Sequence, residues 1–443
     1  MTKGILVIGG GISGIQATLD LADSGIDTYL VERAPSIGGH MTQLDKTFLT
    51  NLCPACFLIP KMISCLRRPN IELITHAEVI EVTGSKGDFK VKILKHPRYV
   101  DEQKCVGCGI CVEKCPVKVP NEFEMGLINR KAIYKQFLQA VPNVMTIDKD
   151  NCLYFRKNVC KVCDKRCPMG AIDYEQQPEE FELHVGAIIV ATGYEQLDPR
   201  TREEYGYGKY VNVKTALEFE RLICASGPTE GELQIEPDRR RPEKIAFVQF
   251  VGETNEYGRE CYASSAICMN ATKYAILVND YYGHIDTHIF YKDMIAIGKG
   301  YQEYVDDAKK QYGVNYIQAI PIEIIEKPTE NKLIIKYHEI QSGTGNGTEK
   351  ENELEVDLVV LLTPLIRSMT NEQLGDILGV EVHESGFFEI EDQLLTPVST
   401  TKDGIFRTGY SENPTDISEM FIQASAAAAK AAEAIAQIEA EGS

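Results

Sequence analysis

The chain has 443 residues, 44% of them hydrophobic and 25% charged, which is enough for two or three domains with cores of their own. Its 46 basic and 65 acidic side chains give a formal net charge of −19, which argues against nucleic acid or an anionic membrane as the main partner. No apolar run reaches the roughly 20 residues that span a bilayer, and the N-terminus lacks signal-peptide anatomy. We therefore expect a cytoplasmic protein without a membrane span.

The 14 cysteines are the exceptional feature of the composition. Eight of them lie between Cys105 and Cys167, and three more stand at Cys53, Cys56 and Cys65. In a chain without a secretion signal, such clustering indicates metal or redox chemistry rather than a disulfide framework.

The N-terminal segment predicts a nucleotide-binding βαβ unit. Residues 4–9 are typical of a strand buried on both faces, an amphipathic helix follows, and residues 27–32 form the next strand. The glycines of Gly9-x-Gly11-x-x-Gly14 allow a tight turn, the close approach of a pyrophosphate and the packing of helix on strand. Glu32 closes the second strand, where its carboxylate can accept hydrogen bonds from ribose hydroxyls.

The rest of the chain predicts further α/β structure around the cysteine-rich block. Residues 71–82 and 89–94 alternate like antiparallel strands, and residues 185–192 return to a buried strand. Residues 195–242 are loop-rich, and the Ala-rich residues 412–438 have the spacing of a helix that packs on the first domain. The elements expected in a second lobe are strands at 244–251, 285–291 and 356–362 and helices at 262–280 and 301–312.

Three segments favour FAD over NAD as the nucleotide. Residues 32–40 resemble the acid-then-Gly-Gly pattern of flavoproteins with two dinucleotide-binding domains, and residues 191–193 resemble their second signature. Residues 404–410 stand where that superfamily has its last FAD strand, although Tyr410 replaces the usual Asp. Ordinary strand-end glycines are the alternative explanation. In the second lobe, residues 252–258 contain no GxGxxG, so we expect the electrons to come from a donor other than NAD(P)H.

The dense cysteine block contains two ferredoxin-like runs. The first is Cys105-x₂-Cys108-x₂-Cys111-x₃-Cys115-Pro, and the second has seven residues between its first two cysteines. In two-cluster ferredoxins the fourth cysteine of each run ligates the other cluster. The set expected for one [4Fe–4S] cluster is Cys105, Cys108, Cys111 and Cys167. The set expected for the other is Cys152, Cys160, Cys163 and Cys115. Structural zinc is the alternative.

Cys53 and Cys56 leave three interpretations open. They follow the Gly-Gly loop, where flavoprotein disulfide reductases place a redox dithiol. They could instead be half of a third cluster, with further ligands among Cys65, Cys261 and Cys268, or two buried structural thiols.

These motifs together resemble the A subunit of heterodisulfide reductase. The resemblance runs from about residue 3 to 436 and is carried by the following segments: 9–14, 44–48, Cys53-x-x-Cys56, 60–62, 105–123, 185–193 and the Ala-rich tail after Asp416-Ile417. It implies a thioredoxin-reductase-like FAD fold with an inserted two-cluster ferredoxin domain. Archaeal members of that family bifurcate electrons at FAD, towards ferredoxin and towards a heterodisulfide on partner subunits.

The chain departs from the longer members of that family at several points. The comparison implies a short form without the N-terminal cluster domain and the C-terminal ferredoxin domain. Phe250 occupies a cysteine position of the longer forms, and Cys261 and Cys268 do not reproduce the family spacing. Bifurcation is therefore not carried over to this chain.

The resemblance also implies roles for individual residues. Lys273 is a candidate for the lysine near flavin N5, with an exposed helix lysine as the alternative, and Asp416-Ile417 would offer a helix N-terminus to the flavin pyrimidine edge. The full set expected to contact FAD is Gly9, Gly11, Ser13, Gly14, Glu32, Arg33, Gly38, Gly39, His40, Met41, Val79, Ala191, Thr192, Gly193, Gly409, Asp416 and Ile417.

The expected fold is therefore an α/β flavoprotein in three parts. Residues 1–95, 181–242 and 366–443 form the FAD-binding domain, residues 96–180 the inserted ferredoxin domain, and residues 243–365 the second lobe. The expected function is that of an FAD- and [4Fe–4S]-containing electron-transfer subunit of an anaerobic complex, forming a homodimer within it. Its partners would resemble the B and C subunits of heterodisulfide reductase, with a ferredoxin or hydrogenase-type donor. A stand-alone disulfide reductase using Cys53 and Cys56, and a ferredoxin-like scaffold with a vestigial nucleotide fold, are the alternatives.

Overall fold

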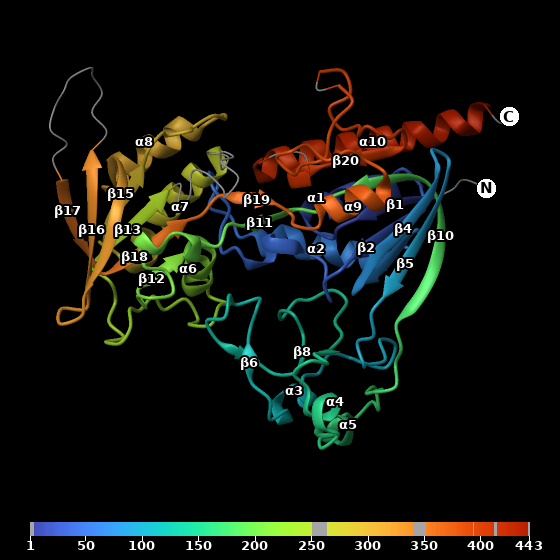
Figure 1. Ribbon diagram of the computed structural model, residues 1–443, viewed down its shortest axis with the longest axis horizontal. Coiled ribbons are helices and arrows are strands. Elements are labelled where there is room, and N and C mark those ends of the chain that lie inside the picture. The colour runs from blue at the N-terminus through green and yellow to red at the C-terminus, as the bar shows by residue number, and fades with distance from the viewer. Residues whose placement is uncertain (1–3, 250–263, 340–350, 393, 412–413, 442–443) are drawn as a thin grey trace.

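The structure is a computed structural model that describes residues 4–249, 264–339, 351–392, 394–411 and 414–441. Two α/β bodies lie side by side, and the cysteine-rich segment hangs below them (Figure 1). No helix in the described ranges combines the length and the apolar character that crossing a membrane requires.

The first sheet has seven strands in the order β3-β2-β1-β10-β5-β4, and β20 also pairs with β10. β1, β2, β3, β20 and the end of β10 are parallel, whereas β4, β5 and the start of β10 are antiparallel. The strands are β1 (Gly4–Ile8), β2 (Thr28–Glu32), β3 (Ile71–Thr75), β4 (Ala77–Ser85), β5 (Asp88–Lys95), β10 (Glu179–Val190) and β20 (Ile405–Arg407).

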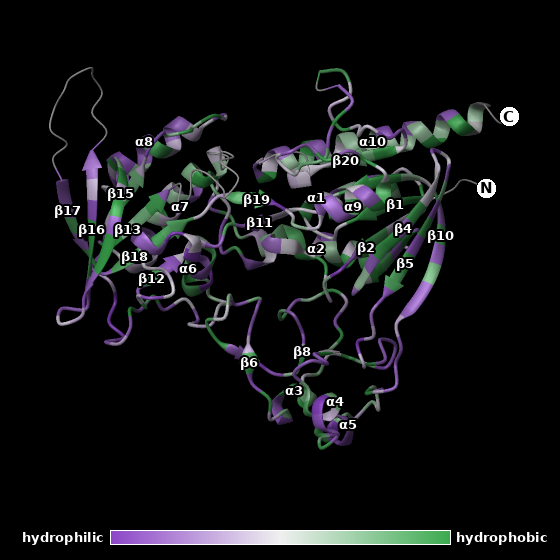
Figure 2. Cartoon of the chain, in the orientation of Figure 1, coloured by the Kyte–Doolittle hydropathy of each residue, from purple (hydrophilic) through white to green (hydrophobic). Residues whose placement is uncertain are grey.

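Helices cover both faces of this sheet, which is why β1 is apolar throughout. Ile5 and Val7 face a core shared with three helices, and Leu6 faces the opposite core together with one helix. The helices of the first core are α1 (Ile12–Asp23), α2 (Pro54–Arg67) and α10 (Ile417–Glu441); that of the second is α9 (Asn371–Leu378). Figure 2 shows apolar residues concentrated in the strands of both bodies.

The second sheet also has seven strands, in the order β12-β18-β13-β14-β15-β16-β17. Its strands are β12 (Val213–Thr215), β13 (Lys244–Gln249), β14 (Asp286–Tyr291), β15 (Asn315–Lys327), β16 (Lys332–Glu339), β17 (Glu351–Val356) and β18 (Leu358–Leu362). Its helices are α6 (Ala216–Ile223), α7 (Ser265–Tyr282) and α8 (Tyr301–Tyr312). A two-stranded ladder of β11 (Tyr194–Gln196) and β19 (Leu365–Arg367) lies between the two bodies (Figure 1).

The cysteine-rich segment contains only short elements. They are α3 (Ile110–Lys114), α4 (Leu153–Lys157), α5 (Val162–Arg166), β6 (Val119–Pro120), β7 (Asn129–Arg130), β8 (Ile133–Tyr134) and β9 (Thr146–Ile147). The remaining short turns are 3-10 helices η1 (Gly39–Gln43), η2 (Pro199–Thr201), η3 (Glu203–Tyr205) and η4 (Gly409–Ser411).

The buried side chain of Arg98 joins the cysteine-rich segment to the first sheet. Its guanidinium donates to the carbonyl of Pro35 (2.8 Å) and the hydroxyl of Thr75 (2.6 Å) on one side. On the other side it donates to Thr146 (2.9 Å) and Glu102 (2.8 Å). Because these bonds are buried, the segment is held against the sheet rather than tethered by its ends alone.

Most strands and helices confirm the sequence expectations, and four segments differ. Residues 71–75 pair in parallel with β2, so the expected antiparallel alternation holds only for β4 and β5. Residues 54–67, for which the sequence analysis expects no helix, form α2. The loop-rich interval 195–242 contains α6, which begins with a capping box of Thr215 and Glu218. β10 begins at Glu179, because its charged first half pairs with β5 in an exposed antiparallel ladder.

Asp357 lies between β17 and β18, and its carboxylate forms ion pairs inside the second body. Its buried carboxylate accepts hydrogen bonds from Arg240 (2.5 Å), Lys332 (2.6 Å) and the backbone N–H groups of Glu243 (2.7 Å) and Lys244 (2.9 Å). Although burial opposes ionisation, these donors lower the pKa of Asp357 from 3.8 to about 2.

We expect Asp357→Asn to destabilise the protein by about 2 kcal/mol at pH 7. Because the folded-state pKa is depressed, this stabilisation is present above pH 3.8 and is lost as the pH falls through about 2. The difference in unfolding free energy between wild type and variant should therefore shrink below pH 4 in urea titrations. A difference that stays constant down to pH 2 would contradict this assignment, and exposed Asp307→Asn is the matched control.

Candidate functional site

A cavity of about 520 Å³ lies at the carboxyl ends of the parallel strands of the first sheet. Its wall includes residues that directly follow or end β1, β2, β10 and β20, where open α/β sheets bind their ligands. The second body adds Ala266 and Asn270 from α7, and the cysteine-rich segment adds Glu122, Phe123 and Gln136. All three parts of the chain therefore meet at one cavity.

The glycine turn between β1 and α1 opens the N-terminus of α1 to this cavity. Gly9 has a φ of +108°, and a Cβ there would overlap the carbonyl oxygen of Ala191. A Cβ on Gly14 would overlap the carbonyl oxygen of Gly9, so α1 packs directly on the turn. A Cβ on Gly11, the N-cap residue of α1, would meet no atom within 4 Å, so the space beside this glycine is open. The backbone N–H groups of α1 can therefore bind a pyrophosphate.

Glu32 stands at the end of β2 with its carboxylate on the glycine turn. One oxygen accepts from the N–H of Gly10 (2.6 Å) and the other from the N–H of Ala34 (2.7 Å). Burial raises the pKa of Glu32, and these backbone hydrogen bonds oppose the rise. Each carboxylate oxygen retains a lone pair, so Glu32 can also accept from a ribose hydroxyl.

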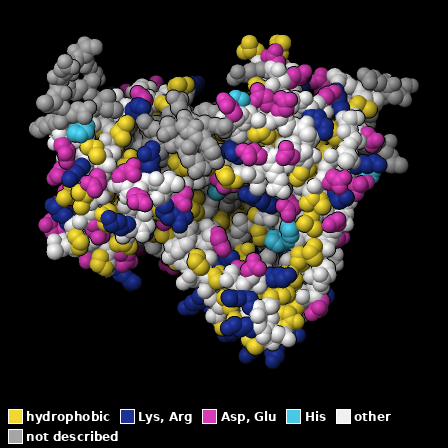
Figure 3. Space-filling model, viewed as in Figure 1, with side chains coloured by type: hydrophobic (Ala, Val, Ile, Leu, Met, Phe, Trp, Pro, Cys, Tyr) yellow, Lys and Arg dark blue, Asp and Glu magenta, His cyan; other side chains and the backbone are white. Residues whose placement is uncertain are grey.

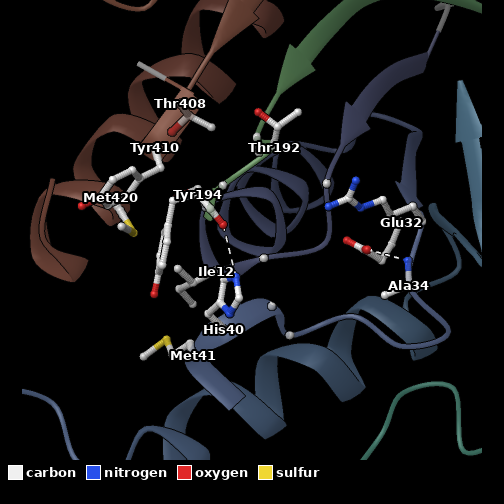
Figure 4. Close-up of a pocket in the computed structure, with 18 of the residues that line it drawn as sticks. Ile12, Glu32, Ala34, His40, Met41, Thr192, Tyr194, Thr408, Tyr410 and Met420 are labelled. Atoms are coloured by element: carbon white, nitrogen blue, oxygen red, sulfur yellow. Dashed lines mark hydrogen bonds between the residues drawn. The ribbon is translucent and has the colours of Figure 1, made fainter. Parts of the chain in front are cut away.

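The Gly-Gly loop lies across the glycine turn and leads to His40, which forms an aromatic part of the cavity wall with Tyr194. The N–H of Gly38 donates to the carbonyl of Gly10 (2.7 Å), and Gly38 has a φ of +124°. Two residues later, His40 stacks on Tyr194 with ring centroids 4.7 Å apart and bonds to the Tyr194 carbonyl (3.2 Å). Figure 4 shows this pair with Met41, Tyr410 and Met420 around the same space, and Glu32 on its other side.

The N-terminus of α10 forms another part of the wall. Asp416 caps the helix by accepting from the N–H of Glu419 (2.9 Å), and its other oxygen accepts from the hydroxyl of Tyr301 on α8. Asp416 and Ile417 both line the cavity. The positive end of the helix dipole therefore points to a place where a ligand's acceptor atoms would be stabilised.

Two residues that sequence reasoning did not select, Thr408 and Tyr194, contribute to the site. Thr408 is fully buried, lines the cavity, and its hydroxyl has no hydrogen-bond partner among the described residues. A buried hydroxyl without a partner is costly, so a polar ligand group here would stabilise it. Together with the open glycine turn, this polar atom shows that the residues present fit a dinucleotide cofactor. Tyr410 also lines the cavity and is 2% exposed, so this position offers a ring where the superfamily has a carboxylate.

The structure brings 15 of the residues expected to contact FAD to this cavity. Gly14 and Gly409 do not line it. Gly14 is the packing contact between helix and turn, and Gly409 donates its N–H to Gln423 of α10 (3.1 Å). Both glycines position the elements that form the cavity and are not part of its wall.

Lys273 lies behind the cavity wall and not in it. Its side chain is 0% exposed, so the exposed helix lysine considered from the sequence is wrong. Its Nζ donates to Glu220 (2.8 Å) and to the carbonyl of Lys46 (3.0 Å). Glu220 also accepts from the N–H of Asp45 (2.7 Å). This pair therefore holds the cavity-lining segment around Lys46, and a direct contact of Lys273 with a flavin stays a prediction.

Four cysteines from both ferredoxin-like runs surround a small second cavity in the cysteine-rich segment. They are Cys105, Cys108, Cys111 and Cys167, the set expected for one cluster. Burial raises the pKa of the Cys111 thiol to about 12, and the neighbouring Cys105 sulfur adds to the rise. Binding of a cluster would therefore displace protons from these thiols.

The other set of cysteines is also gathered in one place. Cys152 lies in the buried core of the segment, and Cys115 and Cys163 pack against that core. Burial is the main cause that raises the pKa of Cys152 and Cys163. Across the described residues, no three His, Cys, Asp or Glu side chains converge on a site for a single metal ion.

Cys53 and Cys56 form a separate pair at the start of α2. Cys53 is half-buried, Cys56 is exposed, and a hydrogen bond with the Cys53 thiol raises the pKa of Cys56. Neither lines the cavity. Of the further ligands considered, Cys65 is in the core of the first body and Cys268 in that of the second. Cys261, like Phe250 and the segment 252–258, lies outside the described residues.

Two family models match the chain. Residues 4–72 match the FAD dependent oxidoreductase family, and residues 98–121 match the 4Fe-4S binding domain. The first match contains the glycine turn, Glu32 and the Gly-Gly loop, and the second contains the first ferredoxin-like run.

Solved structures share the fold. A thioredoxin reductase of Lactococcus lactis matches with a TM-score of 0.52 and 15% identity, covering 98% of this chain and 99% of that one. The thioredoxin reductase of T. acidophilum matches with a TM-score of 0.52 and 13% identity, covering 99% and 98%. The expected thioredoxin-reductase-like fold is confirmed.

Curated relatives match along almost the whole chain. An iron-sulfur A subunit of CoB–CoM heterodisulfide reductase from Methanopyrus kandleri is 48% identical over 98% of this chain and 65% of its own length. The A subunit of the H2:CoB-CoM heterodisulfide, ferredoxin reductase of Methanothermobacter marburgensis is 45% identical over 96% of this chain and 63% of its own. The chain thus spans a little under two thirds of the length of these relatives, and over almost its own whole length it is similar to heterodisulfide reductase A subunits.

Proposed function

We propose that this chain is an electron-transfer subunit that relays electrons between FAD, two [4Fe–4S] clusters and partner subunits of an anaerobic redox complex. The observation that carries the proposal is the shared wall of the cavity. Residues of the fold's nucleotide edge and Glu122, Phe123 and Gln136 of the cysteine-rich segment line the same space. A flavin bound there would supply one- and two-electron chemistry directly beside the segment that carries the cluster ligands.

The contacts favour the Cys105 set as the cluster nearer to the flavin. Lys135 donates to the side-chain oxygen of Asn143 (2.9 Å), whose amide donates to the carbonyl of Val106 (3.3 Å) next to Cys105, and the residue after Lys135, Gln136, lines the cavity. The side chain of Gln136 accepts from the N–H of Ser36 (3.1 Å) in the loop after β2. The chain itself thus supplies a short path from the flavin site to the first cysteine set, and then to the second.

The positions of Cys53 and Cys56 favour a relay over a stand-alone disulfide reductase. A dithiol that exchanges electrons with a flavin has to contact the isoalloxazine, and neither cysteine reaches the cavity wall. The names of the relatives, which are subunits of heterodisulfide and ferredoxin reductases, support partner subunits for this chain as well. Such partners would resemble the B and C subunits or a ferredoxin- or hydrogenase-type donor, around a homodimer of this chain. Strand pairing supports the proposed division into an FAD domain, a ferredoxin insertion and a second lobe, but not its boundary at residue 242, because β12 pairs with β18 of the second sheet.

We expect Glu32→Ala to weaken FAD binding about tenfold to a hundredfold, because it removes a charged acceptor for the ribose and leaves two backbone donors unpaired. Quenching of flavin fluorescence during titration of the apoprotein measures the dissociation constant. Glu72→Ala, an exposed residue of neighbouring β3, is the control and should bind like wild type. Equal affinity of the Glu32 variant and wild type would place the ribose elsewhere.

We expect anaerobically purified protein to contain about eight iron atoms per chain, or about twelve if Cys53 and Cys56 ligate a third cluster. Cys167→Ser should remove one cubane signal from the EPR spectrum of dithionite-reduced protein and lower the iron content by about four. Cys224→Ser, at a buried thiol outside both sets, is the matched control. Zinc in place of iron, or an unchanged spectrum after Cys167→Ser, would contradict the ligand assignment.

The pair Cys53→Ser and Cys56→Ser separates the three interpretations of these thiols. Loss of about four iron atoms indicates a third cluster. Loss of small-disulfide turnover by the isolated chain, with iron retained, indicates a redox dithiol. Retention of the iron with unchanged disulfide turnover indicates structural thiols. The relay excludes only the redox dithiol, because neither cysteine reaches the cavity wall.

A further inference from the structure

His40, in the wall of the cavity, has an acceptor at each of its two ring nitrogens. Its Nδ1 lies 2.8 Å from the side-chain oxygen of Gln43, and its Nε2 lies 3.2 Å from the backbone carbonyl oxygen of Tyr194. Figure 4 draws the second of these bonds. An amide or carbonyl oxygen only accepts hydrogen bonds, so each contact requires a proton on the ring nitrogen that it faces.

The inserted cysteine-rich segment fixes which end of the Gln43 amide faces His40. The amide nitrogen donates to the carbonyl oxygen of Phe123 (2.9 Å), and the Gln43 side chain is buried. Exchanging the amide oxygen and nitrogen would set two acceptor oxygens against each other at this distance. Turning the His40 ring over would place carbon atoms against the oxygens of Gln43 and Tyr194. The oxygens therefore face the ring nitrogens, as the structure has them.

These contacts favour the doubly protonated form of the His40 ring. A neutral imidazole carries a proton on one nitrogen and a lone pair on the other, so either tautomer would turn a lone pair towards an acceptor oxygen. The imidazolium donates to both. The ring also stacks on that of Tyr194, with centroids 4.7 Å apart and planes at 25°, and an aromatic face attracts a cation.

The charge of this imidazolium would act on the flavin half of the site. Both acceptors are uncharged, so they do not neutralise it, and His40 lines the cavity. Glu32 is the expected acceptor for the ribose of the adenosine half, and Figure 4 shows Glu32 and His40 on opposite sides of the space. His40 therefore lies towards the other half of a bound FAD.

The remainder of the protein surrounds this site with negative charge. The formal net charge is −19, and Figure 3 shows Asp and Glu side chains over both α/β bodies. Such charge disfavours the addition of electrons to a group inside the protein, although salt screens the exposed part of it. A cation in the cavity wall opposes this effect at short range, where the electrostatic interaction is strongest.

We propose that His40 is an imidazolium that compensates the negative charge which electrons bring to a bound flavin. The inference rests on the proposed function, since it names the residue that raises the potential of the flavin in the relay. Each electron that enters the flavin adds one negative charge. His40 keeps both of its ring protons throughout, and no bond forms or breaks.

The charge of His40 can be measured directly by ¹⁵N NMR of the cofactor-loaded protein with labelled histidines. We expect two protonated ring nitrogens for His40 at pH 7. Its signals are those that disappear in His40→Asn. A neutral His40 ring, with one protonated nitrogen, would overturn the inference.

A redox titration of the bound flavin, followed by its absorbance, measures the effect of the charge. His40→Asn removes the charge but keeps an N–H group that can donate to Gln43. We expect it to lower the affinity for reduced relative to oxidised flavin about tenfold, which lowers the two-electron midpoint potential by about 30 mV. His40→Arg restores a planar cation and should return most of this difference. The matched control is His184→Asn, the same substitution at an exposed position of β10, which should leave the potential unchanged.

Two results of the titration would also overturn the inference. One is an equal potential of wild type and His40→Asn with flavin bound in both. The other is a lowered potential that His40→Arg does not raise, because the loss would then come from the shape of the side chain and not from its charge. Purified protein that binds no FAD contradicts the proposed function instead, whatever the NMR spectrum shows.

Discussion

The flavin site and the cysteine-rich segment both depend on the pairing of β10. Its first half pairs antiparallel with β5, so that Lys95 and Glu179 lie opposite each other in the ladder. The chain therefore leaves the sheet at the end of β5 and returns to it at the start of the adjacent β10. The cysteine-rich segment between these two points can be inserted without disturbing the strands. The second half of β10 pairs in parallel with β1 and ends at Val190, and the next residue, Ala191, contacts the glycine turn. One strand thus fixes the insertion and the nucleotide edge relative to each other.

Buried ion pairs then hold the three parts together around the cavity. Arg221 of α6 pairs with Glu124 of the cysteine-rich segment (2.8 Å) and donates to the carbonyl of Gln43 beside the cavity (3.0 Å). Lys273 and Glu220 hold the adjoining segment 45–46 from the second body. Removing one member of such a pair leaves a buried charge uncompensated, so each pair resists separation of the parts that it joins. The distance between the flavin site and the cysteine sets is constrained as a result.

The sequence predicts best what depends on local spacing. The glycine turn, Glu32 and both cysteine runs are defined by residues close together in the chain, and their chemistry requires that spacing. The burial of Lys273 was not predictable, because its partner Glu220 is 53 residues away and helical periodicity does not reveal an ion pair. Thr408 lies within residues 404–410, which the sequence assigns to the last FAD strand, but the pattern does not single out its hydroxyl. Only the pairing of β10 with β20 places that hydroxyl at the cavity. The start of β10 was missed because its exposed, charged first half lacks the apolar signal of a buried strand.

The central claim is that one chain couples a flavin to its iron-sulfur clusters over a fixed distance. The direct measurement is rapid one-electron reduction of the FAD in the cofactor-loaded protein, with flavin absorbance and the cubane EPR signal followed over time. The account predicts that the cubane signal grows at the rate at which the reduced flavin is reoxidised, and that this rate does not depend on protein concentration. A rate proportional to concentration, or clusters that remain oxidised while the flavin is reduced, would contradict it.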